Sequence, residues 1–452
     1  MKIIIVGDGK LGSTLTEQLS SEGHDVTVID HQGSVLNNSV NMHDVIGIQG
    51  NGASYDVQME AGVPRSDLVI AATSSDELNI LCCIMAKKLG AKNTIARVRN
   101  PEYSRQLHMM REELGLSMVV NPEREAAREI ARNLRFPSAL HIDLFARGRV
   151  ELVELRINKD SPIADKTLSQ IGSLYKEKFL VCAVNRGNEV YIPTGNFVLH
   201  EGDRIHVTAP AADITSLFTS LGIVHHKVRK VMIVGGGRIT VYLTRQLMEM
   251  GVDVTIIEKD AARCRVLCEY LPKATIINGD GTDRELLGEE SIEDMDAFVA
   301  LTGLDEQNII VSMYAASCGV RKVLTKIDHI LFPEIFANAG IESVVSPIRS
   351  TASQIIRFVR AMQNSLSSSN IETLHKLVSN RVEALEFLVK QKAPYVDVPL
   401  RKLETKDNTL IACILRGGMT IIPGGGDVIK LDDRVIVVAM NGNIRDLRDI
   451  LK

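Results

Sequence analysis

The stretch Lys2 to Asp30, KIIIVGDGKLGSTLTEQLSSEGHDVTVID, decides how this chain folds. A β-branched run, Ile3 to Val6, leads into the turn GDGKLG at residues 7–12, and leucines then recur at helical spacing. A second β-branched run ends at Asp30, 23 residues after Gly7. Strand, glycine turn, helix and acidic strand end, in this order, predict a Rossmann-type dinucleotide site.

Each glycine of the turn has a separate role in such a site. Gly7 permits the tight turn, Gly9 lets the backbone approach a pyrophosphate, and Gly12 lets the helix pack close to the strand. The helix that begins at Lys10 and Leu11 directs free N–H groups and a positive dipole end at the phosphates.

Asp30 lies at the tip of the second predicted strand, where it can accept hydrogen bonds from an adenosine ribose. Its carboxylate favours NAD over NADP, because it would repel a 2′-phosphate. The alternative is a Rossmann-type turn that holds no ligand.

Composition limits the classes of function. The 452 residues suffice for two to four domains, and the net charge of −4 argues against a nucleic-acid partner. Met1 leads directly into a core strand, and no apolar run reaches the ~18 residues of a membrane span, so we expect a soluble protein without membrane insertion. Seven scattered cysteines without CxxC spacing predict reduced thiols and no metal site.

Strands and helices alternate from residue 30 to residue 136. Strands are expected at 45–48, 67–72, 93–98 and 118–120, with helices through Gln58 and over 78–89. Asn121 and Pro122 suit the N-cap and first position of a further helix. The pattern predicts a doubly wound parallel sheet with its ligand crevice at the carboxyl ends of the strands.

The pattern changes near Pro137. From Val150 to Val207 the sequence alternates as β-strands do, at 150–158, 179–184, 189–193 and 203–207, with glycine and proline between the runs. This predicts a small β-rich α+β domain, too short for the catalytic domain of a dehydrogenase.

The whole arrangement then repeats. Gly7 to Asp30 is matched by Gly235 to Glu258 at an offset of 228 residues, and later motifs recur at 229. The fold class is therefore α/β, with two Rossmann-like doubly wound parallel sheets, each followed by a small β-rich α+β domain. The predicted boundaries are 1–136 (first N domain), 137–216 (first C domain), 217–228 (linker), 229–363 (second N domain), 364–371 (linker) and 372–452 (second C domain).

The second N domain is not an exact copy of the first. Thr240 replaces the third glycine, so we expect looser packing of the helix on the strand, and Arg238 takes the place of Lys10. Glu258 keeps the ribose acid. The ligand of the second N domain is left open between NAD(H) and an adenine mononucleotide such as ADP or ATP.

The duplicated order of domains resembles the potassium-conductance regulator family over essentially the whole chain. The motifs that carry the resemblance are GDGKLG with Asp30, the text AATSSDELN at 71–79, the strand Ile95-Ala96-Arg97, and their counterparts in the second N domain. The resemblance implies a gating subunit that binds NAD(H) and assembles as a ring, usually a tetramer. It also implies docking beneath a membrane potassium transporter, so that the protein would be cytoplasmic and peripheral at the inner face of the cell membrane.

The same resemblance assigns further site residues. Gly50 and Asn51 would line the adenine end, Thr73, Ser74 and Asp76 would lie near the second ribose or nicotinamide, and Arg97 near the phosphates. The full set of candidate cofactor-binding residues is Gly7, Gly9, Lys10, Leu11, Gly12, Asp30, Gly50, Asn51, Thr73, Ser74, Asp76, Arg97, Gly235, Gly237, Arg238, Ile239, Glu258, Gly279, Asp280 and Thr302.

Catalytic chemistry is missing from the sequence. No positioned acid or base accompanies the nucleotide motif, and His31 and His225-His226 are expected at the surface. We therefore predict no catalytic residue and a regulatory switch driven by NAD(H). The alternatives are an NAD-dependent oxidoreductase and a scaffold whose N domains hold no ligand. Four arginines on the helix after Pro122 mark either a solvated face or a contact surface for a neighbouring subunit.

Overall fold

The computed structural model describes residues 1–100, 103, 106, 110–136, 140–145, 149–159, 161–175, 178–187, 189–210, 216, 218, 227–328, 341, 343–366, 371–377, 381–440, 444 and 446–452. The chain forms two compact units, each assembled from two separate parts of the sequence. Unit 1 comprises Met1–Ala131 with Arg229–Ile356, and unit 2 comprises Arg132–Val228 with Arg357–Lys452. We describe each unit by itself.

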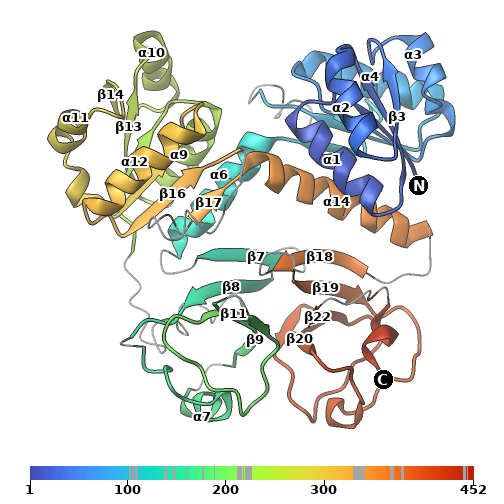
Figure 1. The fold of residues 1–452 in the computed structure, drawn as a ribbon, viewed down its shortest axis with the longest axis vertical. Helices are drawn as coiled ribbons and strands as arrows, with labels where there is room; N and C mark the ends of the chain where they lie inside the picture. Colours follow the sequence, from blue (N-terminus) through green and yellow to red (C-terminus); the bar gives the residue numbers. More distant parts are fainter. Residues whose placement is uncertain are drawn as a thin grey trace. The chain divides into compact units, whose positions relative to one another are not determined.

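Unit 1 contains two six-stranded parallel sheets with helices packed around them (Figure 1). The first sheet has the order β3-β2-β1-β4-β5-β6. Its elements are β1 (Lys2–Val6), α1 (Lys10–Ser21), β2 (Asp25–Asp30), α2 (Gly33–Met42), β3 (Ile46–Gln49), α3 (Tyr55–Glu60), β4 (Leu68–Ala71), α4 (Asp76–Leu89), β5 (Asn93–Arg97), β6 (Met118–Val120) and α6 (Pro122–Arg135).

The second sheet of unit 1 repeats this order as β14-β13-β12-β15-β16-β17. Its elements are β12 (Lys230–Val234), α9 (Arg238–Glu249), β13 (Asp253–Glu258), α10 (Ala261–Tyr270), β14 (Thr275–Asn278), α11 (Arg284–Glu289), β15 (Ala297–Ala300), α12 (Asp305–Ser317), β16 (Lys322–Lys326), β17 (Ser343–Val345) and α14 (Pro347–Leu366). The prediction of two doubly wound parallel sheets is confirmed.

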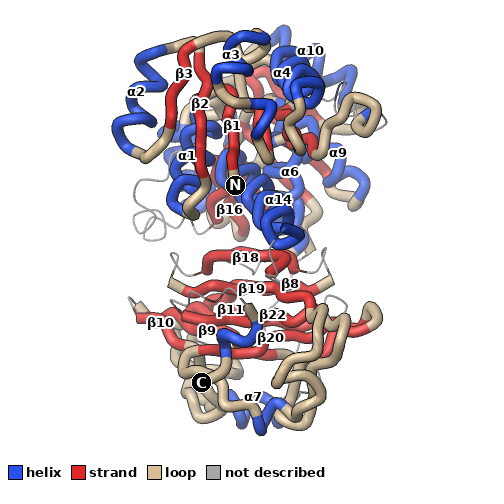
Figure 2. Tube along the Cα trace, turned by 90° about the vertical axis from the view of Figure 1, so that its right-hand side faces the viewer, coloured by secondary structure: helices blue, strands red, loops and turns tan. Residues whose placement is uncertain are grey.

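Strand β1 is buried on both faces, as a central strand of such a sheet must be: Ile3 and Ile5 are fully buried and Ile4 nearly so. Figure 2 shows β1, β2 and β3 side by side with helices around them. Helix α4 starts at Asp76, two residues before the predicted start, because the Ser75 hydroxyl caps it by accepting a hydrogen bond from the N–H of Leu78.

Unit 2 contains two five-stranded antiparallel sheets, ordered β10-β9-β11-β8-β7 and β18-β19-β22-β20-β21. The elements of the first small domain are β7 (His141–Phe145), β8 (Val150–Arg156), α7 (Leu168–Leu174), β9 (Leu180–Arg186), β10 (Glu189–Tyr191) and β11 (Arg204–Pro210). Those of the second are β18 (Ile371–Leu377), β19 (Val382–Leu388), β20 (Thr409–Arg416), β21 (Met419–Ile421) and β22 (Arg434–Met440). Short 3-10 helices lie at Val63–Arg65 and Ile292–Asp294 in unit 1, and at Leu400–Lys402 and Leu447–Ile450 in unit 2.

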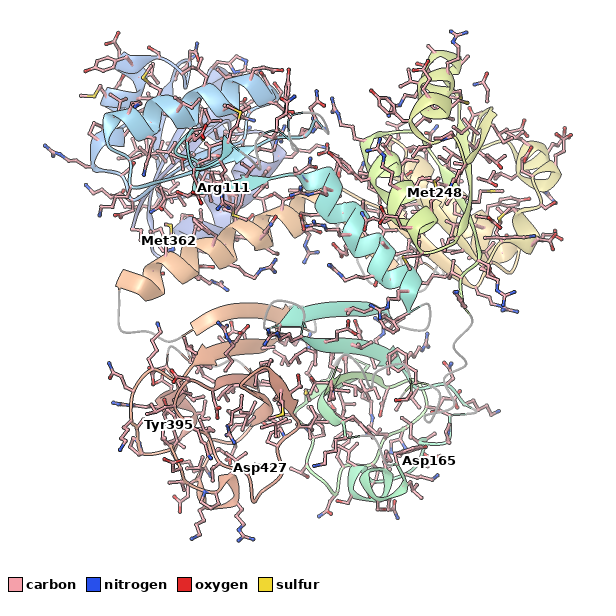
Figure 3. All side chains as sticks on the ribbon, turned by 180° about the vertical axis from the view of Figure 1, so that it is seen from behind. Arg111, Asp165, Met248, Met362, Tyr395 and Asp427 are labelled. Atoms are coloured by element: carbon pink, nitrogen blue, oxygen red, sulfur yellow. The ribbon has the colours of Figure 1, made fainter. Side chains whose placement is uncertain are left out.

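The two small domains share one apolar core within unit 2. Leu152 and Cys182 of the first pack in the same buried cluster as Cys413 and Ile436 of the second. Tyr395, which Figure 3 labels, lies in a separate core of the second domain alone. Burial raises the pKa of the Cys413 thiol to about 12, so this thiol stays protonated at neutral pH. All seven cysteines are free, as predicted.

The linker predicted at 364–371 is wrong at both ends. Helix α14 continues to Leu366, and strand β18 already begins at Ile371. The serines and asparagines there suggested a break, but the stretch contains neither proline nor glycine, so the helix can run on. The predicted linker 217–228 and His225-His226 fall mostly outside the described residues. Within the described part of the chain, no helix is both long and apolar enough to span a bilayer.

The arginine face of α6 is only partly solvated. Arg128 is exposed and pairs with Glu125 at 2.9 Å, as the solvated-face interpretation predicts. Glu129, however, accepts a hydrogen bond from the hydroxyl of Ser350 on α14, in the other half of unit 1. Asn121 caps α6 by accepting from the N–H of Arg124, and its amide also donates to the Tyr242 hydroxyl on α9.

A bidentate ion pair recurs in both small domains. Arg186 donates to both carboxylate oxygens of buried Asp203 at 2.8 Å, and Arg416 binds Asp433 in the same way. Burial alone would raise the pKa of Asp203, but the hydrogen bonds from Arg186 and from the N–H of His200 outweigh it and lower that pKa.

We expect Asp203→Asn to destabilise unit 2 by about 2 kcal/mol near neutral pH, because it removes charge-assisted hydrogen bonds. Since the folded pKa lies below the unfolded value, the wild-type advantage is full above about pH 4 and falls as the pH drops through the folded pKa. Urea unfolding at several pH values measures this. Asp165→Asn, at an exposed carboxylate of the same domain, is the control. Equal losses for the two variants would contradict the prediction.

Candidate functional site

The glycine loops after β1 and β12 have the same backbone geometry. Gly7 has φ +94° and Gly235 has φ +102°, a region that favours glycine. A Cβ on Gly7 would also lie 2.8 Å from the backbone nitrogen of Thr73 at the end of β4. Both the turn and the close strand contact therefore require glycine at this position.

The third loop position differs between the two copies. A Cβ on Gly12 would lie 1.9 Å from the carbonyl oxygen of Gly7, so α1 packs directly on the loop. In the second copy Thr240 is fully buried, and its hydroxyl donates to the carbonyl of Gly235. The N-cap angles of Gly9 and Gly237 nevertheless agree within 2°. The substitution is thus accommodated by a hydrogen bond, and the predicted loosening does not reach the loop backbone.

The acids at the ends of β2 and β13 hold the glycine loops in place. Asp30 accepts from the N–H groups of Asp8 (2.7 Å) and Gln32 (2.9 Å). Glu258 makes the equivalent bonds to Gly236 (2.6 Å) and Asp260 (2.8 Å). Each acid therefore positions the loop, and its remaining lone pairs are available to a ribose hydroxyl.

The two helices that follow the loops begin without a side-chain cap. Gly9 and Gly237 are their N-caps, and a Cβ on either would meet no atom within 4 Å. Open space next to uncapped N–H groups is the arrangement that binds phosphate oxygens.

The ends of β4 and β15 form a second matched feature. Asn79 accepts from the N–H and the hydroxyl of Thr73 and donates to the carbonyl of Arg97. Asn308 repeats this with Thr302 and Lys326. These asparagines tie together the strand ends that form one wall of the site.

The carboxylate of Asp76 binds backbone N–H groups, and Asp76 is not among the residues that line the cavity of unit 1. Its carboxylate accepts from the N–H groups of Arg99 (2.9 Å) and Asn100 (2.7 Å), and it is 9 % exposed. The Asp76 side chain therefore fixes the loop that follows β5.

One cavity of about 1150 Å³ in unit 1 brings most of the predicted residues together. The candidates that line it are Gly7, Gly9, Lys10, Leu11, Asp30, Gly50, Asn51, Thr73, Ser74, Arg97, Gly237, Arg238, Ile239 and Thr302. Those that do not are Gly12, Asp76, Gly235, Glu258, Gly279 and Asp280. Asp280 instead closes its own turn by accepting from Thr282, and these hydrogen bonds lower the pKa of its carboxyl.

The cavity is electrostatically suited to an anion. Arg97 lines it, and its buried Nε has no hydrogen-bond partner among the described residues. Burial, with repulsion from Arg99, lowers the pKa of Arg97. Lys10 and Lys326 reach Asp328 at 3.6 Å and 3.4 Å. A buried guanidinium with an unused N–H fits a phosphate, so the residues present fit a dinucleotide.

Three carboxylates that line the cavity already bind other groups of the protein. Asp30 holds backbone N–H groups, Glu123 pairs with Arg99 at 2.5 Å, and Asp328 pairs with the two lysines. His31 lines the cavity but its side chain is 75 % exposed. Each of these three carboxylates is therefore bound to N–H groups or to a cation through at least one oxygen. Among the described residues there is also no group of side chains that could hold a metal ion.

Several lining residues were not predicted, among them Val35, Arg99, Arg263 and Asp328. Val35 and Arg263 occupy the same helical position at the 228-residue offset, since α2 begins at Gly33 and α10 at Ala261. Extending the repeat register beyond the glycine motif would have found this pair.

Two family models match the chain twice each. The TrkA-N domain matches residues 3–122 and 231–347, and the TrkA-C domain matches residues 152–222 and 384–452. These matches alternate along the sequence as the two kinds of sheet do.

Curated relatives match almost from end to end. The chain is 33% identical over 451 residues to Trk system potassium uptake protein TrkA homolog 1 of Methanosarcina mazei, covering 97% of both chains. It is 32% identical to the TrkA homolog of Archaeoglobus fulgidus over the full length of both. It is 30% identical to TrkA of Haemophilus influenzae, covering 97% of this chain and 95% of that one. These relatives are named as potassium uptake proteins, and not as enzymes.

Solved structures share the fold. The GsuK channel bound to NAD superposes with a TM-score of 0.64 at 17% identity, covering 97% of this chain and 77% of that one. The GsuK RCK domain gives 0.63 at 18% identity, covering 97% and 92%. A GsuK structure bound to ADP gives a TM-score of 0.51 at 14% identity, covering 81% of this chain and 70% of that one.

Proposed function

Because this chain belongs to the TrkA family of potassium uptake proteins, we propose that it is the NAD(H)-binding regulatory subunit of a membrane potassium transporter. The observation that carries the proposal is the cup formed by the glycine loop, Asp30 and Arg97. It presents uncapped N–H groups, a ribose acid and an arginine whose buried Nε has no hydrogen-bond partner among the described residues to one cavity. The N–H groups and the arginine suit the phosphates, and the acid suits the adenosine ribose.

In the first N domain, each of these residues is proposed to bind one part of NAD(H). Gly9 and the first turn of α1 hold the pyrophosphate, Asp30 the adenosine ribose, Gly50 and Asn51 the adenine end, and Arg97 a phosphate charge. When bound, the dinucleotide supplies a charge at its nicotinamide that differs between its oxidised and reduced forms. The second N domain takes NAD(H) or an adenine nucleotide in the equivalent cup.

Regulation follows if the ligands favour different conformations of the chain. A ligand shifts a conformational equilibrium only by its differential affinity for the two states. We propose that NAD(H) occupancy changes the conformation of the chain, and that a ring of identical subunits, a tetramer, transmits the change to the transporter. The chain then acts at the inner face of the cell membrane without entering the bilayer.

An oxidoreductase is the rival candidate, and the site does not favour it. Hydride transfer needs a substrate pocket with an acid or base beside the nicotinamide. The carboxylates that line this cavity are bound to N–H groups or cations, and His31 is exposed to solvent.

A pull-down from native membranes tests the function directly. We expect the tagged chain to capture a potassium-translocating membrane protein, and NADH to change its yield. The Asp30→Ala chain should capture the same protein with a yield that NADH no longer changes. Failure to retain any such transporter, in the presence or absence of NADH, would overturn the proposal.

A further inference from the structure

The two N domains differ at one matched position of their cups. Val35, the third residue of α2, and Arg263, the third residue of α10, both line the cavity. Position 35 therefore presents an uncharged, apolar wall in the first cup, and position 263 presents a guanidinium in the second.

Arg263 is fixed across the glycine loop. Its Nε donates to the carbonyl of Gly236 at 2.6 Å, and an Nη lies 3.5 Å from the carbonyl of Gly237. Gly237 is the glycine over which a pyrophosphate is expected to lie. The cation is thus held by neutral carbonyls next to the phosphate position.

Both cups carry an acid next to the glycine loop, Asp30 in the first and Glu258 in the second, and each accepts hydrogen bonds from loop N–H groups. The guanidinium of Arg263 is an additional charged group on the wall of the second cup, and it favours ligands with more negative charge.

A paired difference behind the loop adds to this contrast. The loop residue is Asp8 in the first copy and Gly236 in the second, and the helix residue facing it is Ser39 in one and Leu267 in the other. A Cβ on Gly236 would lie 2.5 Å from Leu267 and 2.9 Å from Glu258, so only the first copy has space for a carboxyl here. Burial and repulsion by Asp30 raise the pKa of Asp8, and the nearby Ser39 hydroxyl opposes this.

We infer that the second cup selects adenine nucleotides with a terminal phosphate, of the ADP and ATP class, over NAD(H), and that Arg263 sets this preference. The inference rests on the proposed function and deepens it. ADP carries a terminal phosphate whose charge NAD(H) lacks, because each NAD(H) phosphate is joined to a ribose on one side and to the other phosphate on the other side. A cation close to the pyrophosphate therefore gains more from ADP, whereas Val35 gives the first cup no such gain.

Titration calorimetry of the full chain with ADP and with NADH tests the inference one cup at a time. In the Asp30→Ala background, which silences the first cup, we expect ADP to bind more tightly than NADH. Adding Arg263→Val should weaken ADP binding about tenfold, the effect of one nearby charge, and NADH binding by less than threefold. Arg263→Lys should keep most of the ADP affinity, and Arg265→Val, at an exposed arginine of α10, should change neither.

The reciprocal variant, Val35→Arg in the first cup, tests for a gain of affinity, which a folding defect would not produce. In the Glu258→Ala background, Val35→Arg should raise the ADP affinity of the first cup severalfold relative to NADH. Equal losses of ADP and NADH affinity in Arg263→Val, or unchanged ADP binding, would overturn the assignment of Arg263 while leaving nucleotide binding intact. Absence of binding heat for both nucleotides in both backgrounds would overturn the proposed function itself, and the inference with it.

Discussion

Replacing Asp30 by alanine should lower the affinity of the first N domain for NADH by about 100-fold. The carboxylate is expected to accept hydrogen bonds from the adenosine ribose, and charge-assisted bonds of this kind contribute about 1.5–3 kcal/mol each. It also fixes the glycine loop through the N–H groups of Asp8 and Gln32. Loss of both functions accounts for an effect of this size, since every 1.4 kcal/mol is tenfold in affinity.

Fluorescence titration with NADH measures this effect, with the second cup silenced by Glu258→Ala in both chains. Asp30→Asn is the informative companion, because its remaining oxygen can still accept from one N–H group of the loop. We expect it to lose less affinity than Asp30→Ala. Unchanged NADH affinity in Asp30→Ala would mean that the dinucleotide does not bind at the end of β2.

Charging the exposed faces of α4 and α12 should break the proposed ring into smaller species. Leu81 on α4 is 50 % exposed and Ile310 on α12 is 63 % exposed, and the two occupy the same helical position at the 229-residue offset. We propose that these two matched side chains contact a second copy of the chain in the ring. A buried, unpaired carboxylate at such a contact is strongly unfavourable.

Light scattering of Leu81→Asp with Ile310→Asp measures the outcome. We expect the wild-type chain to give the mass of an oligomer and the double variant to give that of a smaller species, with NADH binding retained. Met419→Asp, at a 67 % exposed methionine in unit 2, is the control. A double variant with the wild-type mass would show that these helices are not the assembly surface.

The fold could be predicted from sequence because its signal is local and repeated. The β-branched run before each glycine loop, and the constant spacing from loop to acid, appear twice, so each copy supports the interpretation of the other. Strands β7 and β18 were missed, because each lies at the start of a small domain and carries polar residues between its few apolar ones. They are strands because they pair with β8 and β19, a contact that local sequence does not encode.

The site residues remain predictions, and the structure shows which of them line one cavity. The glycine positions follow from stereochemistry, and most of them meet at one cavity. Asp76 was assigned to the ligand by the family resemblance, and its carboxylate accepts hydrogen bonds from the N–H groups of Arg99 and Asn100. Arg263 was overlooked because its role depends on reaching across the loop to Gly236, which no sequence motif specifies.

The central claim is that nucleotide occupancy of this chain controls potassium transport without chemical change to the nucleotide. Uptake of potassium by the captured transporter, reconstituted with this chain in vesicles, tests it most directly when NADH absorbance is followed in the same sample. We predict that NADH changes the uptake rate with the wild-type chain but not with Asp30→Ala, while the absorbance stays constant. Uptake that does not respond to NADH, or steady loss of the absorbance in step with transport, would contradict the claim.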